Sequence, residues 1–180
     1  MTRLEEMKDL PRVELPADVL DDGHNRIAGL LDLIHDCFNP SSLVVEIGTG
    51  MGVSTEVFAL TVGRVITIDP YFPGSERWRD AAIKVCRRYP DKITQCFDKS
   101  AVVCRTIQNG SVDGVYIDGD HHFESVRDDI LRWLPKLKPD GWMCGHDYIA
   151  RPKYNFGIIE AVNACFGKPR KVYSDFSWVA

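Results

Sequence analysis

From residue 43 onward, short apolar runs alternate with longer segments of helical spacing. Leu43–Ile47 and Val65–Ile68 have the length and composition of strands buried on both faces. Three further strands are predicted over Lys92–Phe97, Val112–Ile117 and Trp142–Gly145. The segments that follow them predict helices over Val53–Thr61, Ser75–Arg88, Ser100–Ile107, Phe123–Leu134 and Phe156–Phe166. Strict alternation of this kind predicts an α/β fold, with a mainly parallel sheet and helices on both of its faces.

The two ends of the chain complete the predicted sheet and add a cap. Arg170–Tyr173 and Ser177–Ala180 lie close together, which predicts two short closing strands in an antiparallel hairpin. We therefore expect a doubly wound, mainly parallel seven-stranded sheet over residues 43–180, with a C-terminal antiparallel hairpin. Ahead of it, the polar arm Met1–Pro16 and a helix over Ile27–Cys37 form a predicted cap, residues 1–42.

Residue spacing also predicts local details. The inner face of the helix over 75–88 is expected to hold Trp78, Ala81, Ala82 and Val85. The inner face of the helix over 123–134 is expected to hold Phe123, Val126, Ile130, Leu131 and Leu134. The segment Pro139-Asp140-Gly141 predicts a turn before the fifth strand.

Composition argues against several classes of protein. The 180 residues carry 22 basic and 26 acidic side chains, a net charge of −4, which gives no support to a nucleic-acid or membrane-surface binder. No apolar run approaches the ~20 residues that span a bilayer, and the charged first residues do not resemble a signal peptide. The six cysteines form no CxxC pair, so we expect small buried thiols in a cytoplasmic protein rather than disulfides or a zinc site.

The first predicted strand ends in a glycine-rich loop, Gly48-Thr49-Gly50-Met51-Gly52, two positions after Glu46. Ligands of open parallel sheets bind beyond the carboxyl ends of the strands, and glycines let the backbone approach them closely. A dinucleotide fingerprint, GxGxxG, would need a glycine where Val53 stands, which disfavours a nicotinamide dehydrogenase. The acid at 46 favours a cationic ligand group over a pyrophosphate.

An acid also follows the second predicted strand. Asp69 lies 23 positions after Glu46, where a carboxylate can accept both hydroxyls of a ribose. The structural alternative is that Asp69 caps the turn before Pro70. Because the glycine loop and this acid occur in one β-α-β unit, we expect the ribose role.

At these residues the chain resembles class I S-adenosylmethionine-dependent methyltransferases, which share a Rossmann-like fold. ExGxGxG at 46–52 is similar to their first motif, and Asp69 to their second. Two later segments, VDGVYIDGDH at 112–121 and LPKLKPDGWMCGHDY at 134–148, look like the small O-methyltransferase-like branch. That branch includes macrocin O-methyltransferases and cephalosporin-hydroxylase-type proteins. The resemblance covers residues 43–180.

The resemblance implies where S-adenosylmethionine would bind. Glu46 and the glycine loop would hold its methionine part, Asp69 its ribose, and Asp98 with Ser100 its adenine. Asp118 would lie near the transferable methyl group. The cofactor residues implied in this way are Glu46, Gly48, Thr49, Gly50, Gly52, Asp69, Asp98, Ser100 and Asp118.

A second polar group follows the fourth and fifth predicted strands: Asp118, Asp120, His121, His122, His146 and Asp147. In metal-dependent O-methyltransferases, acids at these strand ends hold a divalent ion. Asp118 and Asp147 match those acids, whereas Tyr148 stands where the usual third ligand is an Asn. Asp118, Asp147 and His146 are therefore the predicted ligands of Mg²⁺ or another divalent metal, with Asp120 as an alternative third ligand.

A hydroxyl acceptor must lose its proton to become a good nucleophile. His121 is the first candidate for the base and His146 the second, with Asp118 beside the reacting centre. The structural alternatives are that Asp120, His121 and His122 bond the start of the following helix, and that His146 only bonds backbone at a strand end. Outside this group, His24 and His35 are expected at the surface, and Tyr71, Phe72, Trp78, Tyr148 and Tyr154 are candidates for an acceptor pocket.

The sequence therefore predicts a methyltransferase acting on the oxygen of a small molecule or sugar. Two alternatives stay open: a metal-dependent oxygenase or hydrolase that uses His121, His146 and one Asp as a triad, and a non-catalytic cofactor-binding module. Nothing identifies the acceptor, and only residues 1–42 are left to cover its site. The C-terminal aromatics Phe176 and Trp178 are expected to be exposed and are compatible with a homodimer.

Overall fold

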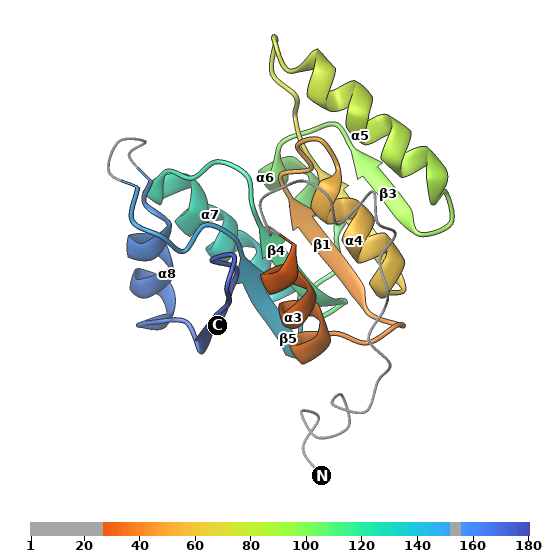
Figure 1. Cartoon of the computed structure of the whole chain (residues 1–180). Helices are drawn as coiled ribbons and strands as arrows, with labels where there is room; N and C mark the ends of the chain where they lie inside the picture. The colour runs from red at the N-terminus through yellow and green to blue at the C-terminus, as the bar shows by residue number, and fades with distance from the viewer. Residues whose placement is uncertain (1–26, 152–155) are drawn as a thin grey trace.

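Seven strands form one sheet in the order β3-β2-β1-β4-β5-β7-β6 (Figure 1). The computed structural model describes residues 27–151 and 156–180. Its strands are β1 (Leu43–Ile47), β2 (Arg64–Ile68), β3 (Ile93–Cys96), β4 (Val112–Ile117), β5 (Leu137–Gly145), β6 (Lys171–Val172) and β7 (Trp178–Val179). Strands β1 to β5 pair in parallel, and β7 is antiparallel to both β5 and β6. The predicted fold class is confirmed, including its closing hairpin.

Helices cover both faces of this sheet. They are α3 (Ala28–Cys37), α4 (Val53–Thr61), α5 (Glu76–Arg88), α6 (Ser100–Val103), α7 (Phe123–Trp133) and α8 (Ile158–Phe166). A 3₁₀ turn, Cys104–Thr106, continues α6, where one longer helix was predicted. Within the described ranges, no helix is long and apolar enough to cross a membrane. The arm Met1–Pro16, His24 and Tyr154 lie outside the described residues.

Alternation along the strands divides the apolar core between the two faces. Val44 packs with α3 and α4, whereas its neighbour Val45 packs with α7 and α8. The predicted cap helix α3 belongs to the first of these layers, since Phe38 meets the ring of Phe58 edge to face. It is also tied to the C-terminal hairpin, because the Asp175 carboxylate accepts a hydrogen bond from the Leu30 amide at 2.7 Å.

Three predictions about which side chains are buried and which are exposed were wrong. Leu131 and Leu134 are exposed, because Val126, Ile130 and Trp133 set the buried face of α7. Trp78 is 56% exposed, and on its helix α5 only Ala82 is fully buried. Trp178, expected at the surface, is completely buried and packs in the second core layer.

The turn predicted at Pro139-Asp140-Gly141 was also wrong. These residues belong to β5, which begins at Leu137. The register against β4 shifts between the Val112–Leu137 and Gly114–Trp142 pairs, and this irregularity accommodates the proline within the strand. The cysteine prediction stands in part: all six thiols are free, but Cys86, Cys96 and Cys165 are only half-buried.

Glu46 is an acid inside this core. Its side chain is fully buried on β1, and it accepts hydrogen bonds from Thr67 on β2 and from Ser54 and Thr55 on α4. Burial raises the pKa of Glu46 from 4.5 to about 7, although the three hydroxyl donors act in the opposite direction. The carboxyl group therefore joins two strands and a helix at the carboxyl end of the sheet.

We predict that Glu46→Gln flattens the dependence of stability on pH. Between pH 4.5 and about 7 the unfolded chain loses the Glu46 proton while the folded chain keeps it, so wild-type stability falls as the pH rises. The glutamine variant should gain up to about 3 kcal/mol relative to wild type across this window, at about 1.4 kcal/mol per pKa unit. Denaturant unfolding at several pH values measures this, with Glu160→Gln on the exposed side of α8 as the control. Parallel curves for Glu46→Gln and wild type would contradict it.

Candidate functional site

The glycine loop has the backbone conformation that its sequence predicts. Gly48, Gly50 and Gly52 have φ angles of 96°, 53° and 88°, a region that side-chain-bearing residues rarely adopt. A Cβ atom on Gly48 would lie 2.1 Å from the carbonyl oxygen of Asp118, whereas one on Gly50 would meet nothing within 4 Å. The loop thus packs tightly against the end of β4 and turns an open backbone surface outward at Gly50.

Asp69 holds the same loop from the neighbouring strand. Its carboxylate accepts hydrogen bonds from the amides of Gly50 at 3.0 Å and Tyr71 at 2.9 Å. The Tyr71 hydroxyl donates in turn to the Gly50 carbonyl at 3.0 Å. The turn-capping role is therefore present. Each carboxylate oxygen has a second lone pair, so the capping bonds leave acceptor capacity for ribose hydroxyls.

Other predicted cofactor residues differ in accessibility. Asp98 is exposed and accepts a hydrogen bond from the Lys99 amide. The Ser100 hydroxyl is engaged with α7, donating to Asp129 and accepting from the Trp133 indole. Thr49 is buried, and its hydroxyl lies 2.6 Å from that of Thr67. Together with buried Glu46, the side chains of Thr49 and Ser100 support the loop and helix from inside.

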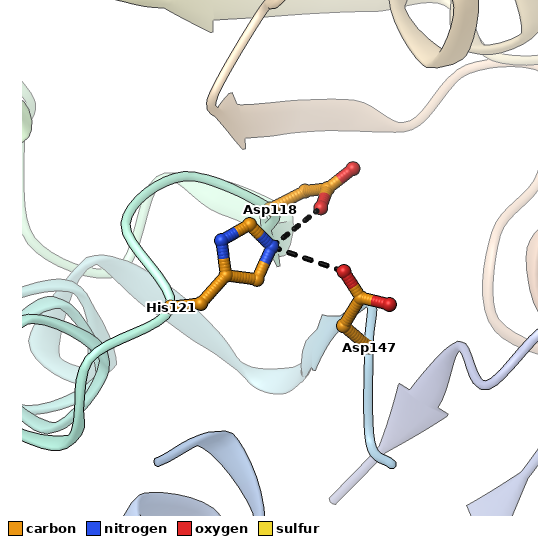
Figure 2. Close-up of side chains that lie close together, drawn as sticks. All are labelled: Asp118, His121 and Asp147. Atoms are coloured by element: carbon orange, nitrogen blue, oxygen red, sulfur yellow. Dashed lines mark ion pairs between the residues drawn. The ribbon is translucent and has the colours of Figure 1, made fainter. Parts of the chain in front are cut away.

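Two carboxylates and an imidazole meet at the ends of β4 and β5. His121 Nε2 lies 3.0 Å from Asp147 Oδ2 and 3.8 Å from Asp118 Oδ1, between the two acids (Figure 2). One ligand atom from each of these three residues lies within 4.8 Å of the other two. His146 borders this group, with Nδ1 3.6 Å from Asp147 Oδ1 and 3.8 Å from Asp118 Oδ1. We call Asp118, His121 and Asp147 the strand-end cluster.

Neighbouring side chains shift the pKa values of this cluster in opposite directions. The carboxylates beside its ring, Asp118 first and then Asp147, raise the pKa of His121 from 6.5 to about 9. Burial alone would raise the pKa of Asp147, but the nearby rings of His121 and His146 outweigh it and lower the pKa below its usual range. Burial opposes a charge on His146, yet Asp147 and Asp118 raise its pKa overall. At neutral pH the cluster therefore holds an imidazolium between carboxylates.

Asp120 and His122 do not join the cluster. The Asp120 carboxylate accepts hydrogen bonds from the amide and ring of His122 and from the Ser125 hydroxyl, all at the start of α7. This is the structural alternative for Asp120, and it leaves His146 as the better supported additional ligand. Tyr148, which stands in the place of an Asn ligand, donates its hydroxyl hydrogen bond to Asn163 on α8.

The strand-end cluster opens into a cleft of about 610 Å³. Its lining residues are Ile27, Leu30, Val53, Ser54, Tyr116, Asp118, His121, His146, Asp147, Arg151, Ser174, Asp175 and Phe176. Sequence reasoning missed Ser54, Tyr116, Arg151, Ser174, Asp175 and the apolar members, which come from five separate segments. Arg151 follows the fifth strand by only a few positions, and that placement could have singled it out. Among the aromatic candidates within the described residues, none lines this cleft, and Tyr116 and Phe176 take that place.

Comparison with known proteins adds the family. A family described as a methyltransferase domain matches residues 45–148. Among curated proteins, an uncharacterized protein y4gI of Sinorhizobium fredii is 36% identical over 52 residues. That match covers 29% of this chain and only 6% of the relative, so this chain spans a small part of its length.

Solved structures share the fold at low sequence identity. An O-methyltransferase from Bacillus cereus, in complex with S-adenosylhomocysteine, has a TM-score of 0.58 and 20% identity, over 98% of this chain and 87% of that one. The O-methyltransferase TomG from Streptomyces achromogenes, in complex with S-adenosylmethionine, has a TM-score of 0.59 and 14% identity, over 98% and 83%. A 1,6-didemethyltoxoflavin-N1-methyltransferase from Burkholderia thailandensis has a TM-score of 0.61 and 16% identity, over 91% and 79%.

The matched family segment begins within β1 and ends just beyond the strand-end cluster, so it contains the glycine loop, Asp69 and all three cluster residues. With more than half of its residues matched, this chain belongs to the methyltransferase-domain family.

Proposed function

We propose that the protein transfers the methyl group of S-adenosylmethionine to a hydroxyl oxygen of a small molecule or sugar. The observation that carries this proposal is the contact between Gly48 and the backbone of Asp118, which joins the glycine loop to the strand-end cluster. Solved structures of the same fold contain S-adenosylmethionine or S-adenosylhomocysteine, which supports the choice of cofactor. Placement in the macrocin and cephalosporin-hydroxylase-type branch is part of the same proposal.

The residues present fit this cofactor. The open backbone at Gly50 leaves room where a side chain would intrude, and Asp69 beside it offers carboxylate lone pairs to a ribose. Asp98 is exposed, so its carboxylate is free to contact the adenosine end of the cofactor. Glu46 would act on the cofactor site indirectly, by holding Ser54. The Ser54 hydroxyl donates a hydrogen bond to the Glu46 carboxylate, and Ser54 lines the cleft. When bound, the cofactor supplies an electrophilic methyl group on a cationic sulfur.

His121 is positioned to activate the acceptor. Its imidazole faces the cleft beside Asp118, and Asp147 orients it through the 3.0 Å contact with Nε2. Because the carboxylates raise the pKa of His121 to about 9, the ring could act as a base only where it is neutral, at alkaline pH, with an acceptor hydroxyl in place of the Asp147 contact at Nε2. That hydroxyl would give its proton to Nε2 as its oxygen displaces the cofactor sulfur from the methyl carbon. His146 lies close enough to the same acids to replace His121 in this role.

The strand-end cluster also fits a divalent metal ion. Two carboxylates and one imidazole are ligands that Mn²⁺ and related ions accept, and His146 could complete the set. A bound ion would lower the pKa of an acceptor hydroxyl and so provide a second route to the nucleophile. In that case His121 or His146 would serve as a ligand rather than as the base.

The arrangement keeps one competing function open. Two imidazoles and two carboxylates around one point can also supply the two-histidine, one-carboxylate triad of a non-haem iron oxygenase. Stoichiometric iron in the purified protein, together with failure to bind S-adenosylmethionine, would favour that function over methyl transfer.

We predict that Asp69→Asn weakens binding of S-adenosylhomocysteine about 10- to 100-fold, because a hydrogen bond to a charged group contributes about 1.5–3 kcal/mol. Isothermal titration calorimetry on protein freed of carried-through nucleosides measures this. The control is Asp91→Asn, an exposed acid in the turn before β3. No binding to wild type, or equal binding to wild type and Asp69→Asn, would refute the cofactor site.

We predict that the protein binds Mn²⁺ and that Asp147→Asn abolishes the binding, because it removes an anionic ligand from the strand-end cluster. Electron paramagnetic resonance of free Mn²⁺ during titration gives the affinity. Asp120→Asn is the matched control, since this neighbouring acid bonds His122 and Ser125 instead. If Asp120→Asn loses Mn²⁺ and Asp147→Asn keeps it, the assignment is wrong.

We further propose that residues 1–42 help to cover the acceptor site. Ile27 and Leu30, at the start of α3, line the cleft, which supports this role for the segment that leads into them. Deleting Met1–Pro16 should therefore raise the KM of the acceptor more than the Kd of S-adenosylmethionine. Turnover and calorimetry on the same sample measure both, and an equal loss would count against the cap.

A further inference from the structure

The imidazole of His121 lies flat against a phenyl ring. Its ring and that of Phe156 are stacked, with centroids 4.4 Å apart and planes 11° from parallel. His121 belongs to the loop between β4 and α7, whereas Phe156 lies just before α8. Two segments that are 35 positions apart in the sequence therefore meet at the proposed base.

Backbone contacts hold Phe156 in this position. The amide of Gly157 donates a hydrogen bond to the carbonyl oxygen of His121 at 2.8 Å. A Cβ atom on Gly157 would lie 2.5 Å from the backbone nitrogen of Phe123, so this approach requires a residue without a side chain. The stack therefore depends on the close packing of the residues at the start of α8 against those at the start of α7.

The stack restricts the torsion that matters most for His121. Rotation about χ2 of a histidine is broad, so a carboxylate contact on one edge alone leaves the ring plane poorly defined. A phenyl ring parallel to the imidazole fixes that plane, and the 3.0 Å contact with Asp147 then fixes which edge faces the cleft. Both restraints act on the same ring from different directions.

We propose that Phe156 is a positioning residue, which holds the His121 imidazole in the plane that directs Nε2 toward Asp118 and Asp147. This inference rests on the role proposed above for His121. Arg151 also lines the cleft, with its Cζ 5.9 Å from the centroid of the Phe156 ring and its Nη2 3.6 Å from Asp147 Oδ1, so the phenyl ring adjoins a guanidinium as well as the imidazole. Phe156 therefore contacts residues of the cleft as well as packing against the core beside α7 and α8.

Nuclear magnetic resonance of the whole chain tests this placement without cofactor or acceptor. The phenyl ring current should shift the ring protons of His121 upfield, and nuclear Overhauser contacts should connect them to the β protons of Asp147. In Phe156→Leu the ring protons should return downfield and these contacts should weaken. Phe156→Tyr should preserve both signals. His121→Gln assigns the resonances, and Phe166→Leu, at the end of α8, controls for loss of a partly buried phenyl ring elsewhere.

Two results would overturn the inference. One is a His121 spectrum that Phe156→Leu leaves unchanged, and the other is a loss of the ring-current shift with unaltered contacts to Asp147. In the methyl-transfer assay, Phe156→Leu should lower kcat about tenfold or more, with little change in the KM of S-adenosylmethionine, because misplacement of a reacting group costs rate. Unchanged cofactor binding with altered His121 signals separates this inference from a failure of the proposed function, which would appear as no cofactor binding by wild type.

Discussion

The parallel pairing of β1 with β4 is the contact on which the site depends. Glu46 pairs with Tyr116 and Ile47 with Ile117, so both strands end at the same level. Beyond them the Gly48 backbone lies where a side chain would strike the Asp118 carbonyl. This close approach places the glycine loop, which fits a cofactor, beside the strand-end cluster, which fits the acceptor or a metal ion. A change in register of one residue would separate the two.

The C-terminal hairpin is part of this site as well as an edge of the sheet. Asp147 has a φ angle of 55°, in a region that aspartate tolerates better than most residues. The loop that holds it is bonded from the hairpin, since the Trp178 indole donates to the His146 carbonyl and the Tyr148 amide donates to the Phe176 carbonyl. Buried Trp178 therefore stabilises the backbone from which the strand-end cluster projects, which explains why an aromatic near the chain end is fully enclosed.

Much of this architecture could be predicted from the sequence, because apolar runs and glycines report backbone requirements directly. The strands, their order in chain and the glycine loop followed from the runs beginning at Leu43 and the glycines at 48, 50 and 52. The contact of His121 with Asp147 and its stack on Phe156 depend on how the loops after β4 and β5 fold, and no local pattern encodes that. For the same reason burial of Glu46 beneath α4 was not apparent, since its three hydroxyl partners come from two other elements.

In the proposed function, one edge of the sheet binds the cofactor and presents its methyl group to the strand-end cluster. A crystal structure of the protein grown with S-adenosylhomocysteine and Mn²⁺ tests it most directly. We expect ribose hydroxyls on Asp69, the cofactor sulfur facing Asp118, and Mn²⁺ within ligand distance of Asp118 and Asp147. Cofactor bound away from the Gly48–Gly52 loop, or a sulfur directed away from Asp118 and His121, would contradict it.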